Sequence, residues 1–125
     1  MEKLGLLLER MENGSPILHL MLKEEEVVAA VDERDDRSFA DQWMSLFRQV
    51  EIIKGGRRDA DPRVGRLREL AYLQAFERWR SSDLAAMISD DFGLIGDALA
   101  VGFEDESIKK ILEQYLALKF PRRIA

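Results

Sequence analysis

Two runs of acidic residues have side chains that could bind a hard cation. Glu24, Glu25 and Glu26 are consecutive, and Asp90 and Asp91 are adjacent. Carboxylate oxygens are the ligands that calcium and magnesium prefer. However, consecutive residues of a helix point about 100° apart, so three in a row cannot converge on one ion. The calcium-loop pattern, with spaced acids and a central glycine, is also absent. We therefore expect no metal site and interpret both runs as solvated helix faces.

Residues suited to covalent or acid–base catalysis are few. The chain has one histidine, His19, and no cysteine. The absence of cysteine excludes disulfides, thiol catalysis and thiolate metal sites. No Glu-x-x-His pair occurs, which excludes the di-iron arrangement of helical bundles. The serines mostly stand where helix caps are expected, without a base near them in sequence. We expect a protein that is not an enzyme and has no cofactor.

A basic loop offers an alternative chemistry. Gly55 and Gly56 are followed by four arginines that could hold an anion: Arg57, Arg58, Arg63 and Arg66. Glycine backbone N–H groups, arginine forks and the helix N-terminus at Pro62 are all suited to phosphate. The phosphate-loop pattern Gly-x4-Gly-Lys-Ser/Thr is missing. The loop therefore predicts either a helix end with a solvated connection or a binding site for nucleic acid or another phosphoanion.

The segment Pro62 to Arg80 is the helix around which we expect the fold to form. Asp61 can cap it, and Pro62 suits the first helical position. Seven apolar residues share one broad side: Val64, Leu67, Ala71, Tyr72, Ala75, Phe76 and Trp79. Arg68 interrupts this side, and a buried charge needs a partner. We predict a structural ion pair of Arg68 with Glu24, which interrupts its own apolar stripe, or with Asp91 or Asp97.

Other apolar patterns complete an all-α fold. Helices are predicted at residues 3–12, 17–34, 38–54, 83–88 and 108–118, with a kink or restart at residues 89–91 leading to a further helical segment that ends near Gly102. Residues 17–22 could instead form a short strand, because their apolar run does not alternate clearly. Residues 1–125 thus predict one helical domain, a compact bundle of five to seven mostly antiparallel helices. Helices should cover at least about 65% of it, well above the usual third.

Charge is distributed unevenly along the chain. The net charge is −5, yet residues 24–36 contain seven acids and one base, and residues 83–106 contain seven acids and no base. Such stretches repel phosphates, which argues against general binding of nucleic acid. No apolar run is long enough to span a membrane, and no secretory leader pattern is present. We therefore expect a cytoplasmic protein whose acidic surfaces attract a basic partner.

These observations favour a small acidic module that binds another protein. The segment after Ser81 combines unopposed acids with glycines that thin the helix surface, so the predicted partner-binding residues are Asp90, Asp91, Gly93, Asp97 and Glu104. The most concrete version of this hypothesis is a neutralising factor, immunity-like or antitoxin-like, for a basic partner. The alternative hypothesis is a helical protein that binds nucleic acid or phosphoanions through the loop from Gly55 to Arg66.

Overall fold

The computed structural model describes residues 2–58 and 60–124. Helices make up 78% of these residues, and none of them lies in a strand. The α-helices are α1 (Lys3–Gly14), α2 (Val27–Asp35), α3 (Arg37–Lys54), α4 (Pro62–Trp79), α5 (Ser82–Val101) and α6 (Glu106–Leu116), with short 3-10 helices η1 (Pro16–His19) and η2 (Glu24–Glu26). The predicted compact helical bundle is confirmed. In the described part, no helix combines the length and apolar character needed to cross a membrane.

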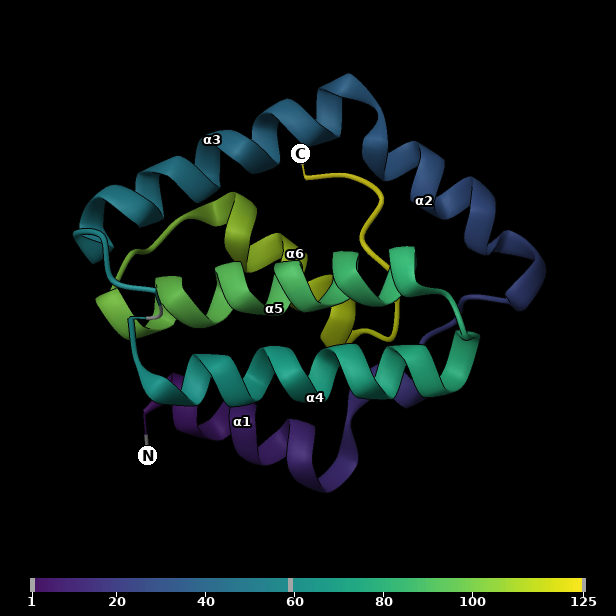
Figure 1. Cartoon of the computed structure of the whole chain (residues 1–125), viewed down its shortest axis with the longest axis horizontal. Helices are drawn as coiled ribbons and strands as arrows, with labels where there is room; N and C mark the ends of the chain where they lie inside the picture. The colour runs from purple at the N-terminus through teal and green to yellow at the C-terminus, as the bar shows by residue number, and fades with distance from the viewer. Residues whose placement is uncertain (1, 59, 125) are drawn as a thin grey trace.

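The antiparallel pair α4 and α5 forms the centre of the molecule (Figure 1). A tight turn joins the two helices, where Arg80 takes a left-handed conformation with φ of 55° and Ser81 caps α5. Helix α1 packs on α4, and α6 packs on α5. Helices α2 and α3 form an arch along the other side of α5. The pair α4–α5 is therefore the platform on which every other helix is placed.

Helix α4 begins as its sequence predicts. The Asp61 carboxylate accepts the Arg63 N–H, and Pro62 occupies the first turn. Five residues of the predicted apolar side are buried: Val64, Leu67, Ala71, Ala75 and Trp79. This stripe packs against α5, which contributes the largest share of the buried residues.

Helix α5 is continuous from Ser82 to Val101, so the predicted kink at residues 89–91 is wrong. Ser and Asp favour helix starts because their side chains compete for nearby backbone N–H groups. Here those side chains bond to other helices instead. The Ser89 hydroxyl donates to the Arg68 carbonyl on α4 at 3.0 Å. The Asp91 carboxylate accepts from side chains of three other helices. With these groups satisfied across the fold, nothing interrupts the helix.

Two glycines of α5 allow α4 to approach closely. A Cβ at Gly93 would lie 2.5 Å from Cδ of Arg68, and a Cβ at Gly96 would lie 3.1 Å from Leu67. The side chain of Arg68 therefore crosses the bare backbone of Gly93. Both glycines are buried. They serve helix packing and do not thin an outer surface.

The prediction of one helix over residues 17–34 is also wrong. Only Val27–Asp35 is α-helical, and Pro16 to Glu26 contains two 3-10 turns with extended residues between them. The reason is tertiary hydrogen bonding. The Arg78 guanidinium donates to the carbonyls of Ile17 and Leu20, and the Trp79 indole donates to the carbonyl of Leu22. The carbonyls of Ile17 and Leu20 also accept local backbone N–H groups, from Leu20 and Leu22. The bonds from α4 therefore stabilise short turns and extended backbone in place of an α-helix.

Candidate functional site

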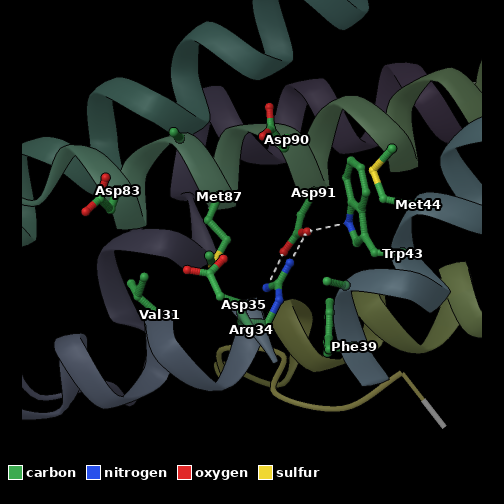
Figure 2. A pocket seen from close by; sticks show the side chains of 12 residues that line it. Val31, Arg34, Asp35, Phe39, Trp43, Met44, Asp83, Met87, Asp90 and Asp91 are labelled. Carbon is green, nitrogen blue, oxygen red and sulfur yellow. Dashed lines mark hydrogen bonds and ion pairs between the residues drawn. The ribbon is translucent and has the colours of Figure 1, made fainter. Parts of the chain in front are cut away.

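A groove opens between the arch of α2 and α3 and the outer side of α5 (Figure 2). Its volume is about 390 Å³. Helix α2 contributes Val31, Arg34 and Asp35; α3 contributes Phe39, Ala40, Trp43 and Met44; α5 contributes Asp83, Ala86, Met87, Asp90 and Asp91. The lining thus combines four aspartates and one arginine with a set of apolar and aromatic side chains.

Helical spacing explains which residues reach the groove. Asp83, Met87 and Asp90 are separated by four and three residues, which places them on one face of α5. Val31 and Asp35 share a face of α2 for the same reason. On α3, Met44 is 39% exposed. Figure 2 shows Asp83 and Val31 at one end of the groove.

A buried ion pair forms the floor. Arg34 donates from Nη1 to Oδ2 of Asp91 at 2.9 Å and from Nη2 to Oδ1 at 2.6 Å. Arg34 is 5% exposed and Asp91 is fully buried. The Arg34 guanidinium also lies over the Phe39 ring, 4.0 Å from its centroid, and donates to the Pro121 carbonyl. This bidentate geometry offsets the cost of removing both charges from water.

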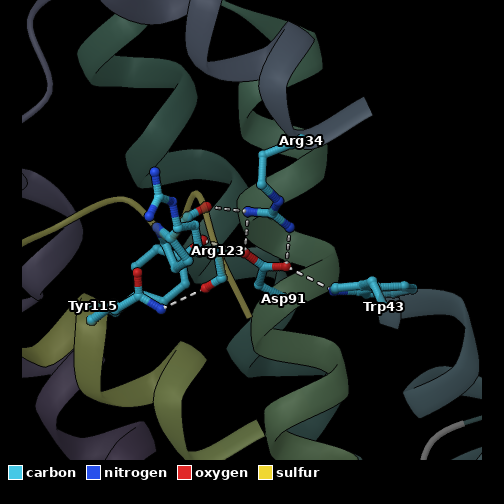
Figure 3. Close-up of polar contacts among 7 residues, drawn as sticks. Arg34, Trp43, Asp91, Tyr115 and Arg123 are labelled. Carbon is cyan, nitrogen blue, oxygen red and sulfur yellow. Dashed lines mark hydrogen bonds and ion pairs between the residues drawn. The ribbon is translucent and has the colours of Figure 1, made fainter. Parts of the chain in front are cut away.

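Two further donors converge on the same carboxylate (Figure 3). The Trp43 indole N–H donates to Asp91 at 3.0 Å, and the Tyr115 hydroxyl donates to it at 2.5 Å. Asp91 on α5 therefore joins α2, α3 and α6. Because these bonds fix the arch relative to α5, the groove has a defined shape before any ligand arrives.

The electrostatics of the floor follow from burial and from Asp91. Burial alone would lower the pKa of Arg34, but the Asp91 carboxylate outweighs it and the pKa is raised. Burial, with the Asp91 charge, raises the pKa of Tyr115 well above its usual value. At neutral pH the Arg34 guanidinium therefore keeps its charge and the Tyr115 phenol keeps its proton, so both can donate to Asp91.

Asp90, on the outer rim, experiences a different balance. Partial burial raises its pKa first, and the charge of the neighbouring Asp91 raises it further. The positive charges of Arg68 and Arg34 act in the opposite direction but do not cancel these effects. Burial, more than the surrounding charges, therefore accounts for the raised pKa of Asp90.

A comparison with known protein families shows to which family this chain belongs. Residues 6–122 match the family described as Immunity protein PIM1. The chain belongs to this family. The match runs from α1 to the segment after α6 and includes every residue of the groove. No curated protein and no solved structure matched the chain. Membership confirms, at the level of the family, the expectation of an immunity-like factor.

The predicted partner-binding residues of this immunity protein do not form one surface. Asp91 is fully buried, Asp97 is 6% exposed, and Gly93 is buried against Arg68. These three therefore present little or no surface to a partner, because side chains from α2, α3, α4 and α6 pack over them. Asp90 is exposed on the groove. Glu104 is exposed elsewhere, at a cleft between the end of α5 and α6.

Glu24 is one of the partners predicted for Arg68 in a buried or half-buried ion pair. Glu24 is exposed on the 3-10 turn η2, since residues 17–26 do not continue as a helix. The rival aspartates are engaged by other cations. Asp91 binds Arg34, and Asp97 binds Nζ of Lys54 at 3.0 Å. Arg68 is half-buried.

Sequence reasoning missed the pair of Arg34 and Asp91, although a signal for it exists. Leu84, Ile88, Asp91 and Ile95 follow one another at helical spacing, so Asp91 lies within the apolar stripe of a continuous α5. The expected restart at residues 89–91 concealed this stripe. Arg34 is the one base of the acidic stretch at residues 24–36.

The arginines of the basic loop are mostly engaged within the protein. Arg57 donates to the Lys54 carbonyl at the end of α3. Arg63 binds Asp61 and Glu2, and Arg66 binds Glu69. Arg58 is exposed, and its carbonyl accepts from Lys54. An anion at this loop would have to displace carboxylates from two of the four guanidinium groups.

Other candidate residues are dispersed. His19 is exposed at the end of η1. Across residues 2–58 and 60–124, no group of three or more histidine or acidic side chains is placed where it could hold a metal ion. The groove is therefore the place where charged and apolar groups converge most clearly.

Proposed function

We propose that this chain neutralises a protein partner with a basic surface by binding it at the groove between α2, α3 and α5. Membership of an immunity protein family supports a neutralising role. One observation supports the groove in particular. Asp35 comes from the first acidic stretch and Asp83 and Asp90 come from the second, and all three line one cavity with partly exposed apolar side chains.

The physical basis is complementarity. An acidic rim steers a basic partner and raises the association rate. Exposed apolar groups such as Met44 supply the burial that gives affinity once contact is made. The network beneath the groove holds both walls in place, so little conformational entropy is lost on binding. Neutralisation then follows from occupation of the partner's surface and requires no catalysis by this chain.

The test uses a toxic protein that the chain protects against, identified by rescue of growth on co-expression. Isothermal titration of the purified pair gives the affinity. The triple variant Asp35→Lys, Asp83→Lys, Asp90→Lys should bind the toxin at least about tenfold more weakly, since each opposed charge is worth up to about 1 kcal/mol. It should also lose protection.

The matched control is Glu9→Lys, Glu12→Lys, Glu77→Lys. These exposed acids lie on α1 and α4, on the other side of the bundle, and the change in net charge is the same. Equal loss of affinity in both triple variants would show that only net charge matters and would overturn the groove as the site.

The alternative function, binding of nucleic acid or phosphoanions by Arg57, Arg58, Arg63 and Arg66, has less support. Most of these side chains already bond to carboxylates or carbonyls of the chain. The discriminating measurement is a titration with an oligonucleotide at low salt, followed at two salt concentrations. A saturable, salt-dependent shift that is lost in Arg58→Ala would favour this function over the first.

A further inference from the structure

The groove has the composition of a site for one long cationic side chain. Its apolar groups include both a thioether and an aromatic ring, and its charged rim is acidic. An arginine side chain has the complementary construction, since its aliphatic stem covers apolar surface while its head remains with polar groups. A guanidinium is also more weakly hydrated than an ammonium, so it enters a half-apolar site at lower cost.

The arrangement of the rim argues against a metal ion as the occupant. In the described residues, no three acidic side chains are close enough to hold one. Figure 2 shows Asp35 beside Met87, while Asp83 lies nearer the end of the groove. Acids that are spread along a groove suit an extended organic cation better than a compact inorganic one.

The cations of the chain itself do not fill this role. Arg34 lies at the floor with its guanidinium engaged by Asp91 on one side and by the Phe39 ring on another. Four aspartates and one arginine line the groove, so acidic side chains outnumber basic ones there. A positive charge from outside the chain would complete the site.

We propose that the groove binds an arginine side chain of the partner, with its stem against Met87 and its guanidinium between Asp35 and Asp83. This inference rests on the proposed function, because it names the group by which the partner is held. Lysine would occupy the same place more weakly, since it lacks the planar fork that pairs with two carboxylates.

The test is an NMR titration of the full chain labelled at its methionine methyl groups and amides. The probes are the peptides acetyl-Ala-Arg-Ala-amide and acetyl-Ala-citrulline-Ala-amide, which differ by the charge of nearly isosteric side chains. The arginine peptide should shift the methyl signal of Met87 in a saturable way, and the citrulline peptide should bind about tenfold more weakly.

Two variants locate the guanidinium. Asp35→Asn with Asp83→Asn should abolish the preference for arginine over citrulline. Glu12→Gln with Glu77→Gln, at exposed positions of α1 and α4, should leave it unchanged. Equal binding of both peptides, or shifts that avoid Met87, would overturn the inference.

The toxin separates this inference from the proposed function. If the toxin binds the chain and Asp35→Asn with Asp83→Asn leaves that affinity intact, the arginine site is overturned while neutralisation stands. If no toxin binds or is neutralised, the proposed function fails. A shift produced by the arginine peptide would in that case show a cation site without a neutralising role, and the partner's arginine would be overturned with it.

Discussion

Arg34 and Asp91 lie 57 positions apart in sequence and form a bidentate ion pair in which neither residue is more than 5% exposed. The pair connects α2 to α5, and through Trp43 and Tyr115 it also connects α3 and α6. Four helices therefore meet at one carboxylate. This relationship gives the groove its floor and leads to the first two predictions.

Removal of the Asp91 carboxylate should destabilise the protein strongly. Asp91→Ala leaves the Arg34 charge buried without its partner, which costs about 3–5 kcal/mol. Urea unfolding measures this change. The control is Asp90→Ala at the neighbouring, exposed position, where we expect a change within about 0.5 kcal/mol. Similar losses for the two variants would mean that burial of Asp91 has no energetic consequence.

Stability should decrease at high pH partly because of Tyr115. Its folded-state pKa is raised, so the unfolded state loses the phenolic proton first, above about pH 10. From there the free energy of unfolding falls by up to about 1.4 kcal/mol per pH unit for this one proton. Urea unfolding between pH 8 and pH 11.5 gives the slope for the parent and for Tyr115→Phe.

The variant Tyr115→Phe isolates the contribution of Tyr115 to the pH dependence of stability. It is needed because Lys54 also has a raised pKa and adds a pH dependence of its own. Tyr115→Phe should be less stable at pH 8 by about 1.5–3 kcal/mol, the range for a hydrogen bond to a charged group. Above pH 10 its stability should fall less steeply than that of the parent. Parallel curves would show that Tyr115 does not contribute.

The contact between α4 and α5 should not tolerate a methyl group at Gly96. A Cβ there would lie 3.1–3.3 Å from Leu67 and Val64. Overpacking of this kind costs about 1–3 kcal/mol, and the gain in helix propensity returns at most about 1 kcal/mol. Gly96→Ala should therefore lower the midpoint of thermal unfolding. Gly14→Ala is the control, since a Cβ at Gly14 meets nothing within 4 Å.

The extended segment before α2 should depend on Arg78. Arg78→Ala frees the carbonyls of Ile17 and Leu20, and bonds from a charged donor are worth about 1.5–3 kcal/mol each. Hydrogen exchange at Met21, whose N–H donates to Leu118, should accelerate about tenfold or more. The variant Arg66→Ala, at an exposed position, should leave this exchange unchanged. Unchanged exchange in Arg78→Ala itself would contradict the account of why residues 17–26 are not one helix.

The sequence alone determined the helical class and the position of the central helix. Helix patterns repeat over three to four residues, so local spacing places Val64, Leu67, Ala71 and Ala75 on one side without knowledge of their neighbours. Caps are local as well: Asp61 and Pro62 start α4, and Gly55 ends α3 in a left-handed conformation. The uneven distribution of acidic residues is also given by the sequence, and it led to the expectation of a protein-binding role.

The tertiary structure decided which of those residues are available to a partner. Asp90 and Asp91 are adjacent and chemically identical, yet Asp90 is exposed and Asp91 is covered by side chains from three other helices. That distinction depends on the 100° rotation between neighbouring positions of a helix and on the arrival of Arg34, Trp43 and Tyr115 from distant parts of the chain. Likewise, Arg78 and Trp79 donate to backbone carbonyls before α2, where a helix was expected and the backbone forms short turns and extended segments. Long-range hydrogen bonds compete with local ones at similar energy. Local sequence patterns indicate only the local hydrogen bonds, so they cannot show where a long-range bond will replace them.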